Sequence, residues 1–388
     1  MKTREEREFN LAKVIVFSIT HFIHDIYTAI LSPLLPVIIE RLQLSLLKAG
    51  LMLPIFRTPI LIQPYIGYHA DRGKALRFLP VALIFTSVSM SLFANSTSYL
   101  MACILLFITG LSAAFYHAPA VFLVGNASGA RPGTGMSIFM TGGEMARSLG
   151  PLYIVTIINL LPLRFSILAA IPGLIAAVLL MLTVPELTEK DRNRSEHSLT
   201  FSKLFREGGK SLYILIFISI FQSFTKFSFT LFLPTYMKTI GFRLFVAGSS
   251  LSILELTGAF GALTGGTISD FVGRKKFLVI ATLAVPVFIN LFLTSKTLLL
   301  KMIYLLIEGI FMFSISPVRY AIAQELVPKY KGTVSSLIMA LSFFTTTFAS
   351  IVTGYLGDKL GLYSSFRIIS FIPIITIPAV MLLPSKRH

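Results

Sequence analysis

The chain has 388 residues, of which 55% are hydrophobic and only 13% charged, and its mean hydropathy is +0.81. Soluble proteins carry roughly twice that share of charged residues, so a soluble multidomain protein and a disordered chain are both excluded. The single cysteine, Cys103, also excludes a secreted disulfide scaffold. An all-α membrane protein remains, and at about 30 residues for each span and its loop the length allows about twelve spans.

Twelve apolar segments are predicted to cross the membrane as helices. Most exceed 18 residues, which is long enough to cross about 30 Å of hydrocarbon. The first segment is too long for a signal peptide and lacks a cleavage site, so we expect it to stay in the membrane. The predicted segments are 11–39, 47–69, 77–95, 99–123, 133–158, 165–184, 210–237, 245–269, 277–295, 299–323, 333–356 and 367–384.

The positions of Lys and Arg explain the net charge of +17. On this map, 21 of the 34 Lys and Arg residues lie on the side of the two termini and 9 on the opposite side. The positive-inside rule therefore predicts that both termini are cytoplasmic. Loop charges of this kind report topology and contact with anionic lipid headgroups, so they do not indicate nucleic-acid binding.

The chain is predicted to consist of two similar halves joined by a linker. The longest polar stretch separates an N-terminal six-helix bundle, 1–185, from a C-terminal one, 210–388, and the cytoplasmic linker covers 186–209. Gly67 and Gly266 are 199 residues apart, and Pro119 and Pro317 are 198 apart. Such duplicated units place a substrate site near the middle of the bilayer, between the halves.

A glycine-rich loop motif follows the second and the eighth predicted spans. It reads GYHADRGK from Gly67 and GTISDFVGRKK from Gly266. A carboxylate there can accept hydrogen bonds from a helix N-terminus or pair with a cation. We therefore expect a conformational latch; the alternative is a tight cytoplasmic turn. The latch residues are Asp71, Arg72, Asp270 and Arg274.

These motifs, present in both halves, resemble those of the major facilitator superfamily. The resemblance implies two six-helix bundles that work by alternating access around a central cavity. Three segments also resemble the fosmidomycin-resistance group of exporters: FIHD with LSPLLP in span one, FYHAP in span four, and GTGMSIF leading to SLGP in span five. This implies a proton-coupled exporter of a small organic compound, anionic or amphiphilic. A proton-coupled uptake symporter and a lipid or lysolipid flippase remain the alternatives.

Ionisable side chains at membrane depth are costly to insert and usually face a partner or a cavity. His21 and Asp25 lie four residues apart on one helical face and could share a proton near neutral pH. A structural pair that fixes span one is the alternative, and a metal site that includes His24 is a third. The predicted proton-coupling residues are Asp25, His21, Glu144, His117 and Glu308.

Further polar residues are predicted to line the substrate cavity. His24 is expected to point away from Asp25, and Arg57 and Glu255 hold equivalent places in the two halves. Glu144 and Arg147, three residues apart, can pair within one helix. The cations favour an acidic substrate. The predicted cavity residues are His24, Arg57, Arg147, Lys226, Glu255 and Arg319.

The sequence does not favour an enzyme. It contains no HExxH, Walker or GxSxG motif, and the lone cysteine has no partner. We expect no cofactor and no metal. The expected partners are a small-molecule substrate, protons and membrane lipids. We expect a monomer in the inner membrane of a prokaryote.

Overall fold

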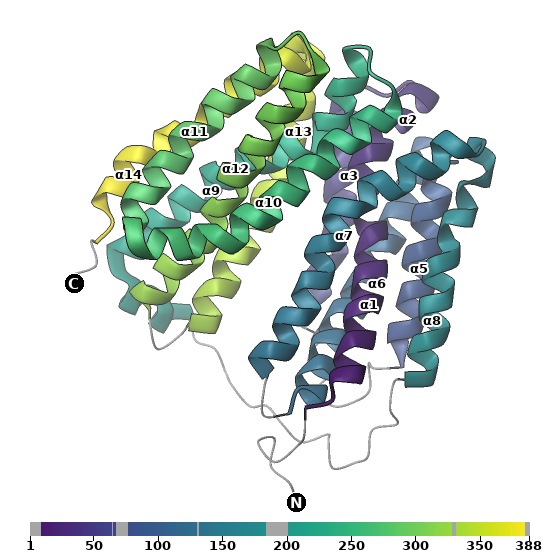
Figure 1. Ribbon diagram of the computed structural model, residues 1–388, viewed down its shortest axis with the longest axis horizontal. Coiled ribbons are helices and arrows are strands. Elements are labelled where there is room, and N and C mark those ends of the chain that lie inside the picture. The colour runs from purple at the N-terminus through teal and green to yellow at the C-terminus, as the bar shows by residue number, and fades with distance from the viewer. Residues whose placement is uncertain are drawn as a thin grey trace, which may run out of the picture. The chain divides into compact units, whose positions relative to one another are not determined.

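The computed structural model describes residues 9–63, 65–66, 77–129, 132–183, 201–327 and 331–384, where the regular structure is helical (Figure 1). The first half contains α1 (Leu11–Thr28), α2 (Leu31–Leu42), α3 (Leu46–Arg57), η2 (Thr58–Ile62), α5 (Phe78–Phe93), α6 (Tyr99–Ala127), α7 (Pro132–Leu160), η3 (Leu163–Ala170) and α8 (Ile171–Thr183). The second contains α9 (Phe201–Thr239), α10 (Leu244–Val272), α11 (Arg274–Thr294), α12 (Leu298–Leu326), α13 (Lys331–Ser370), η6 (Ile372–Thr376) and α14 (Ile377–Leu382).

The all-α membrane fold predicted from the sequence is confirmed. Among the described residues, 8 helical stretches are long and apolar enough to cross a membrane, and Phe78–Phe93 is a shorter apolar helix. One of these stretches, Ala340–Leu382, covers parts of the last two predicted spans. The helix α13 within it contains a non-helical residue at Gly361, with φ of 77°. Glycine tolerates this left-handed conformation, so the chain can turn there between two spans.

Prolines explain why two predicted spans are interrupted. The first span is broken between α1 and α2, just before Pro33, and the second changes to a 3₁₀ helix at Thr58, just before Pro59. Proline has no amide hydrogen, and its ring collides with the carbonyl group four residues earlier. A proline inside an apolar helical pattern therefore bends or ends the regular α-helix without ending the span.

The chain divides into two compact units. The first comprises Met1–Leu44, Met52–Glu196 and the short segment Arg243–Gly248. The second comprises the short segment Ser45–Leu51 together with His197–Phe242 and Ser249–His388. Residues 184–200, which include most of the predicted linker, lie outside the described residues.

In the first unit, α1 lies against α5, α6, α7 and α8 (Figure 1). Two glycines allow α7 to approach α1 closely, because a Cβ at Gly142 would lie 2.6 Å from the Ser18 carbonyl oxygen, and one at Gly150 would lie 2.9 Å from the Ile26 carbonyl oxygen. A buried apolar cluster that includes Phe17, Tyr116, Phe139 and Leu180 holds these helices together. The buried polar side chains of α1, those of Thr20, His21, His24 and Asp25, therefore face neighbouring helices.

In the second unit, α9 packs against α12 and α13, and α11 packs against α12. Lys301 is buried near the start of α12, and its Nζ donates to the carbonyl oxygens of Phe292 and Leu293 at 2.8 and 3.5 Å. Those carbonyls belong to the last turn of α11, where a helix lacks internal hydrogen-bond donors. The lysine therefore caps α11.

The first turn of α3 belongs to the second unit and is capped by Asp358 of α13. The Leu46 and Leu47 amides donate to the two carboxylate oxygens of Asp358 at 2.6 and 2.9 Å. A Cβ at Gly354 would lie 2.4 Å from the carbonyl oxygen of Leu46, so only glycine permits this approach. The carboxylate satisfies amides that the helix cannot satisfy itself, which fixes where α3 begins.

Candidate functional site

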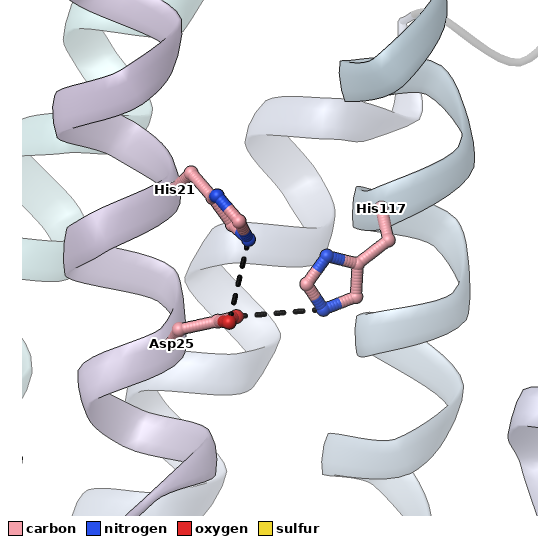
Figure 2. Close-up of side chains that lie close together, drawn as sticks. All are labelled: His21, Asp25 and His117. Atoms are coloured by element: carbon pink, nitrogen blue, oxygen red, sulfur yellow. Dashed lines mark ion pairs between the residues drawn. The ribbon is translucent and has the colours of Figure 1, made fainter. Parts of the chain in front are cut away.

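The carboxylate of Asp25, on α1, is surrounded by three imidazoles, and Figure 2 shows two of them, those of His21 and His117. His21 Nε2 lies 3.3 Å from its Oδ2, while His24 Nδ1 and His117 Nε2 lie 2.9 and 3.4 Å from its Oδ1. Asp25 is only 5% exposed, and His21 and His24 are also buried. The structure therefore brings together three of the residues predicted to carry protons, Asp25, His21 and His117, and adds His24 to them.

Helix geometry explains how one short segment supplies three of these four groups. His21 and Asp25 are one turn apart on α1, so their side chains lie on the same face. His117 comes from α6, which packs against α1. On α7, Gly143 leaves room for the cluster, because a Cβ there would lie 2.7 Å from Cε1 of His21 and 3.2 Å from Oδ2 of Asp25.

The backbone fixes the tautomer of His21. Its Nδ1 lies 2.9 Å from the carbonyl oxygen of Phe139, and this oxygen can only accept, so Nδ1 carries a hydrogen. In a neutral His21 the other nitrogen, Nε2, then presents a lone pair to the Asp25 carboxylate. Two acceptors facing each other at 3.3 Å repel unless a cation lies between them or one of the two groups is protonated. A proton held between the two groups would remove this repulsion.

His24 differs from its sequence prediction. We expected it to point away from Asp25, because neighbouring residues project about 100° apart on a helix. The structure instead places its Nδ1 2.9 Å from Asp25 Oδ1 and its Nε2 3.2 Å from the hydroxyl of Thr86 on α5. Nδ1 is the ring nitrogen nearest the backbone of His24, so it can reach the carboxylate of the next residue, Asp25, although the two side chains leave the helix in different directions.

A metal ion is the alternative occupant of this cluster. One ligand atom from each of His21, Asp25 and His117 lies within 4.8 Å of the others. Zinc uses histidine and carboxylate ligands at about 2.0–2.2 Å in a tetrahedral arrangement. Charge and ligand type therefore fit a divalent cation as well as a proton.

Two arginines of the first unit interact electrostatically with the cluster. Arg57, at the end of α3, interacts electrostatically with Asp25 and Arg147, and its guanidinium lies 4.9 Å from the centre of the Phe56 ring. Arg147 forms the predicted ion pair with Glu144 on α7, where both side chains are 46% exposed. Glu144 directly follows Gly143 and Arg147 lies one turn beyond it, and Arg147 interacts electrostatically with His21 of the Asp25 cluster.

The remaining predicted residues lie in the second unit. Lys226, on α9, places Nζ 3.6 Å from the centre of the Phe313 ring, and Glu255 is partly buried on α10. Arg319 is buried on α12, where it donates to the Ser219 carbonyl at 2.7 Å and to the Ser223 hydroxyl at 3.1 Å. Glu308 is buried on the same helix and does not belong to the Asp25 cluster.

Comparison with known families decides what kind of protein carries this site. The family model described as Major Facilitator Superfamily matches residues 17–270 and 215–388, and so covers most of the chain. The chain belongs to the major facilitator superfamily. It is therefore a secondary transporter of small molecules in a membrane rather than an enzyme.

Relatives of this superfamily member include the fosmidomycin resistance protein of Escherichia coli, which is 24% identical over 96% of this chain and 92% of the relative. An uncharacterised MFS-type transporter of Bacillus subtilis, YfnC, is 25% identical over 96% of this chain and 93% of its own length. The chain thus resembles the fosmidomycin-resistance group that the sequence motifs indicated.

Solved transporters share the fold. An inward-facing, unoccupied bacterial homologue of the human lysosomal transporter Spinster superposes with a TM-score of 0.80 at 14% identity and covers 97% of both chains. The nucleoside transporter NupG gives 0.76 at 15% identity over 96% of this chain and 99% of its own. The all-helical superfamily fold predicted from the sequence is confirmed.

Of the predicted latch residues, Asp270 and Arg274 form an ion pair of 2.8 Å. Arg274 also pairs with Glu325 of α12 at 2.8 Å and donates to the Ser269 hydroxyl at 3.0 Å. Glu325 was not predicted, because nothing in its local sequence marks it as a partner. Asp71 and Arg72 lie outside the described residues.

Sequence reasoning also missed the groups that hold the histidines in place, namely Thr86, Gly143, the Phe139 carbonyl and the Tyr116 ring. A backbone carbonyl leaves no signal in a sequence. The Gly142-Gly143 pair in an apolar helix was a usable signal, because glycine there indicates close approach of another group.

Proposed function

We propose that this transporter is a proton-coupled exporter, an antiporter, of a small organic compound and that Asp25 with His21 carries the coupled proton. The observation that supports this most strongly is the contact of His21 Nδ1 with the Phe139 carbonyl, because it leaves Nε2 to face the carboxylate of Asp25. A secondary transporter needs a group that binds and releases its driving ion, and a histidine–carboxylate pair can do so near neutral pH.

Losing the proton would change the forces within the first unit. With the proton present, His21 and Asp25 attract, and α1 is held to the Phe139 carbonyl of α7 through the same imidazole. Without it, two acceptors face each other and the negative charge of Asp25 is exposed to His117 and Arg57. Proton release therefore favours a different arrangement of α1, α6 and α7, which is what coupling requires.

The same cations support a substrate with a carboxylate, phosphate or phosphonate group, because Arg57 and Arg147 interact electrostatically with the proton site. Protonating the cluster adds a positive charge near these arginines. Deprotonating it leaves the Asp25 carboxylate to compete with an acidic substrate for them. In one conformation the proton would thus strengthen the binding of an acidic substrate, which by itself fits symport, so antiport requires that the two bind in different conformations. The similarity to a fosmidomycin resistance protein supports export as the direction and makes fosmidomycin a reasonable first probe.

Uptake symport and lipid or lysolipid flipping are the alternatives on this fold. One solved structure with the same fold is titled D-xylose-proton symporter, with a TM-score of 0.73 at 17% identity over 97% of this chain and 98% of its own. Only the direction of proton flux relative to substrate separates an exporter from a symporter. The expected location is the bacterial inner membrane, with the protein working as a monomer and both termini in the cytoplasm.

The test is transport into proteoliposomes that contain the purified chain. An acidic lumen takes the place of the acidic cell exterior, so protons that leave the lumen should drive fosmidomycin into it, as they would drive export from a cell. Collapse of the pH gradient should stop this accumulation. Asp25→Asn should abolish this response but retain counterflow exchange of fosmidomycin, which needs no net proton movement. A proton response that persists in Asp25→Asn would refute the assignment. Loss of wild-type activity on adding a chelator would instead identify a metal at the cluster.

A further inference from the structure

The second unit contains a buried carboxyl group that the proposed mechanism does not use. Glu308 lies on α12 with 0% exposure. Within the described part of the chain, neither of its two carboxyl oxygens has a hydrogen-bond partner. The other buried charged side chains differ: Lys301 caps α11, Arg319 donates to Ser219 and Ser223, and Asp25 contacts three imidazoles.

The charged groups around Glu308 do not compensate it. Its neighbour Gly309 lies against α10, where an added Cβ would be 2.4 Å from the carbonyl of Leu254, so Glu255 is on the adjoining helix. On α9, the ammonium of Lys226 lies over Phe313, five residues further along α12. Neither residue bonds or pairs with Glu308.

The other ionisable groups of the second unit are either further from Glu308 along the chain or already hydrogen-bonded to other residues. On α12 itself, Tyr304 lies one turn before Glu308, Lys301 two turns before and Arg319 three turns after. The charged residues of α11 are at its first turn, and the described charged side chains of α13 lie close to its break at Gly361. On α11 these residues are Arg274, Lys275 and Lys276, and on α13 they are Asp358, Lys359 and Arg367.

An ionised carboxylate requires hydrogen-bond donors or a cation when it leaves water, whereas a neutral carboxylic acid requires much less. Glu308 has neither a donor nor a cation among the described residues. We propose that Glu308 is a second proton-binding site, held as the neutral acid in this conformation, and that it loses its proton only when a rearrangement of the second unit admits water or a cation.

This inference extends the proposed function, on which its role in transport rests. The Asp25 cluster belongs to the first unit and Glu308 to the second, so each unit would bind one proton. Two coupled protons would change the energetics of transport. At zero membrane potential, a gradient of about one pH unit supports about tenfold accumulation with one proton per substrate and about hundredfold with two.

The first test does not depend on transport. Dicyclohexylcarbodiimide in lipid reacts with a neutral carboxylic acid: the acid proton moves to a carbodiimide nitrogen, and the carboxyl oxygen bonds to the central carbon. The O-acylisourea formed rearranges to a stable N-acylurea of the same mass. Mass spectrometry of the intact chain in liposomes should find this adduct on Glu308 and not on Glu325, which is paired with Arg274 on the same helix.

Glu308→Gln should remove the adduct, whereas Glu325→Gln should leave its yield unchanged. Absence of the adduct on Glu308 at neutral pH, in protein that retains its melting temperature, would overturn the proposal even if proton-driven transport is confirmed. Conversely, if the wild-type protein shows no response to a pH gradient, the proposed function fails, and the labelling alone decides whether Glu308 holds a proton.

The second test measures accumulation of fosmidomycin in proteoliposomes, with the membrane potential clamped at zero by valinomycin and potassium. The wild-type protein should approach about hundredfold accumulation at about one pH unit, and Glu308→Gln should fall to about tenfold. Asp25→Asn should lose the response altogether, because on this proposal the rearrangement that lets Glu308 release its proton depends on proton release at Asp25. Equal limiting ratios for wild type and Glu308→Gln would exclude Glu308 as a coupled site.

Discussion

The ring of Tyr116 lies flat on the imidazole of His24, with centroids 4.1 Å apart and planes 6° apart. The tyrosine is itself fixed, because its hydroxyl donates to Oγ1 of Thr20 at 3.0 Å. The stack and the contact with Thr86 hold the His24 ring so that Nδ1 faces Asp25. Tyr116 thus positions one of the three imidazoles around the carboxylate without contacting the carboxylate itself.

We therefore expect the shape of Tyr116 to matter more than its hydroxyl. Tyr116→Phe retains the stack and loses one hydrogen bond, worth about 1 kcal/mol of stability, so pH-driven transport should change by less than about twofold. Tyr116→Leu removes the aromatic face and should reduce transport by about tenfold. Initial rates of uptake in vesicles measure both. Equal defects in the two variants would show that the hydroxyl is the important group.

The space at Gly143 gives a second prediction. A methyl group there would lie 2.7 Å from Cε1 of His21, so Gly143→Ala must displace the imidazole from Asp25 or from the Phe139 carbonyl. We expect loss of pH-driven transport by at least about tenfold, with counterflow less affected. Thr141→Ala, at an exposed position two residues earlier on α7, is the matched control and should retain normal transport. Normal coupling in Gly143→Ala would mean that the His21 contact is not needed.

The cap of α3 predicts a loss of stability. Asp358→Asn replaces one acceptor oxygen by a donor that cannot bond the Leu46 or Leu47 amide. Because the site is exposed, we expect a loss of about 0.5–1 kcal/mol, equivalent to a fall of about 1–2 °C in melting temperature. Thermal unfolding in detergent measures this, with Lys359→Gln as a control for the local charge. An unchanged melting temperature in Asp358→Asn would show that water replaces the cap.

Lys226 tests the charge of the substrate. If its ammonium attracts an acidic group, Lys226→Ala should weaken binding of fosmidomycin by about tenfold and leave a neutral compound nearly unaffected. Lys238→Ala, an exposed cation at the end of the same helix, should change neither affinity. Fluorescence or calorimetric titration of purified protein measures the affinities. Tight binding of a bulky hydrophobic cation that does not depend on Lys226 would instead indicate a multidrug transporter.

The orientation in the membrane is a further prediction. Single cysteines at Asn95 and Arg194, in a background with Cys103→Ser, should differ in reactivity toward an impermeant maleimide added to intact cells. We expect labelling at position 95 only, because 194 belongs to the predicted cytoplasmic linker. Equal labelling of both positions from the outside would contradict the topology inferred from the Lys and Arg distribution.

The sequence predicted the fold well and the site in part, for different physical reasons. Apolar segment length and repeated motifs depend on local composition, so the helical architecture could be predicted without knowing any contact. His21 and Asp25 could be paired because their spacing on one helix determines their relative positions. His117 could be selected as an ionisable group at membrane depth, but not as a neighbour of Asp25, because this depends on how α6 packs against α1. The orientation of His24 depends in addition on Thr86 and Tyr116, which come from two other helices.

The capping of α11 by Lys301 has a consequence for the biogenesis of the protein. A lysine costs about 2.5–3.5 kcal/mol to insert at the centre of a spanning helix and less near its end, and the buried Lys301 lies near the start of one. The carbonyls of Phe292 and Leu293 reduce this cost only when α11 is already beside α12. We therefore expect the two helices to leave the translocon together as a hairpin, so that a mutation which delays the insertion of α11 also delays that of α12.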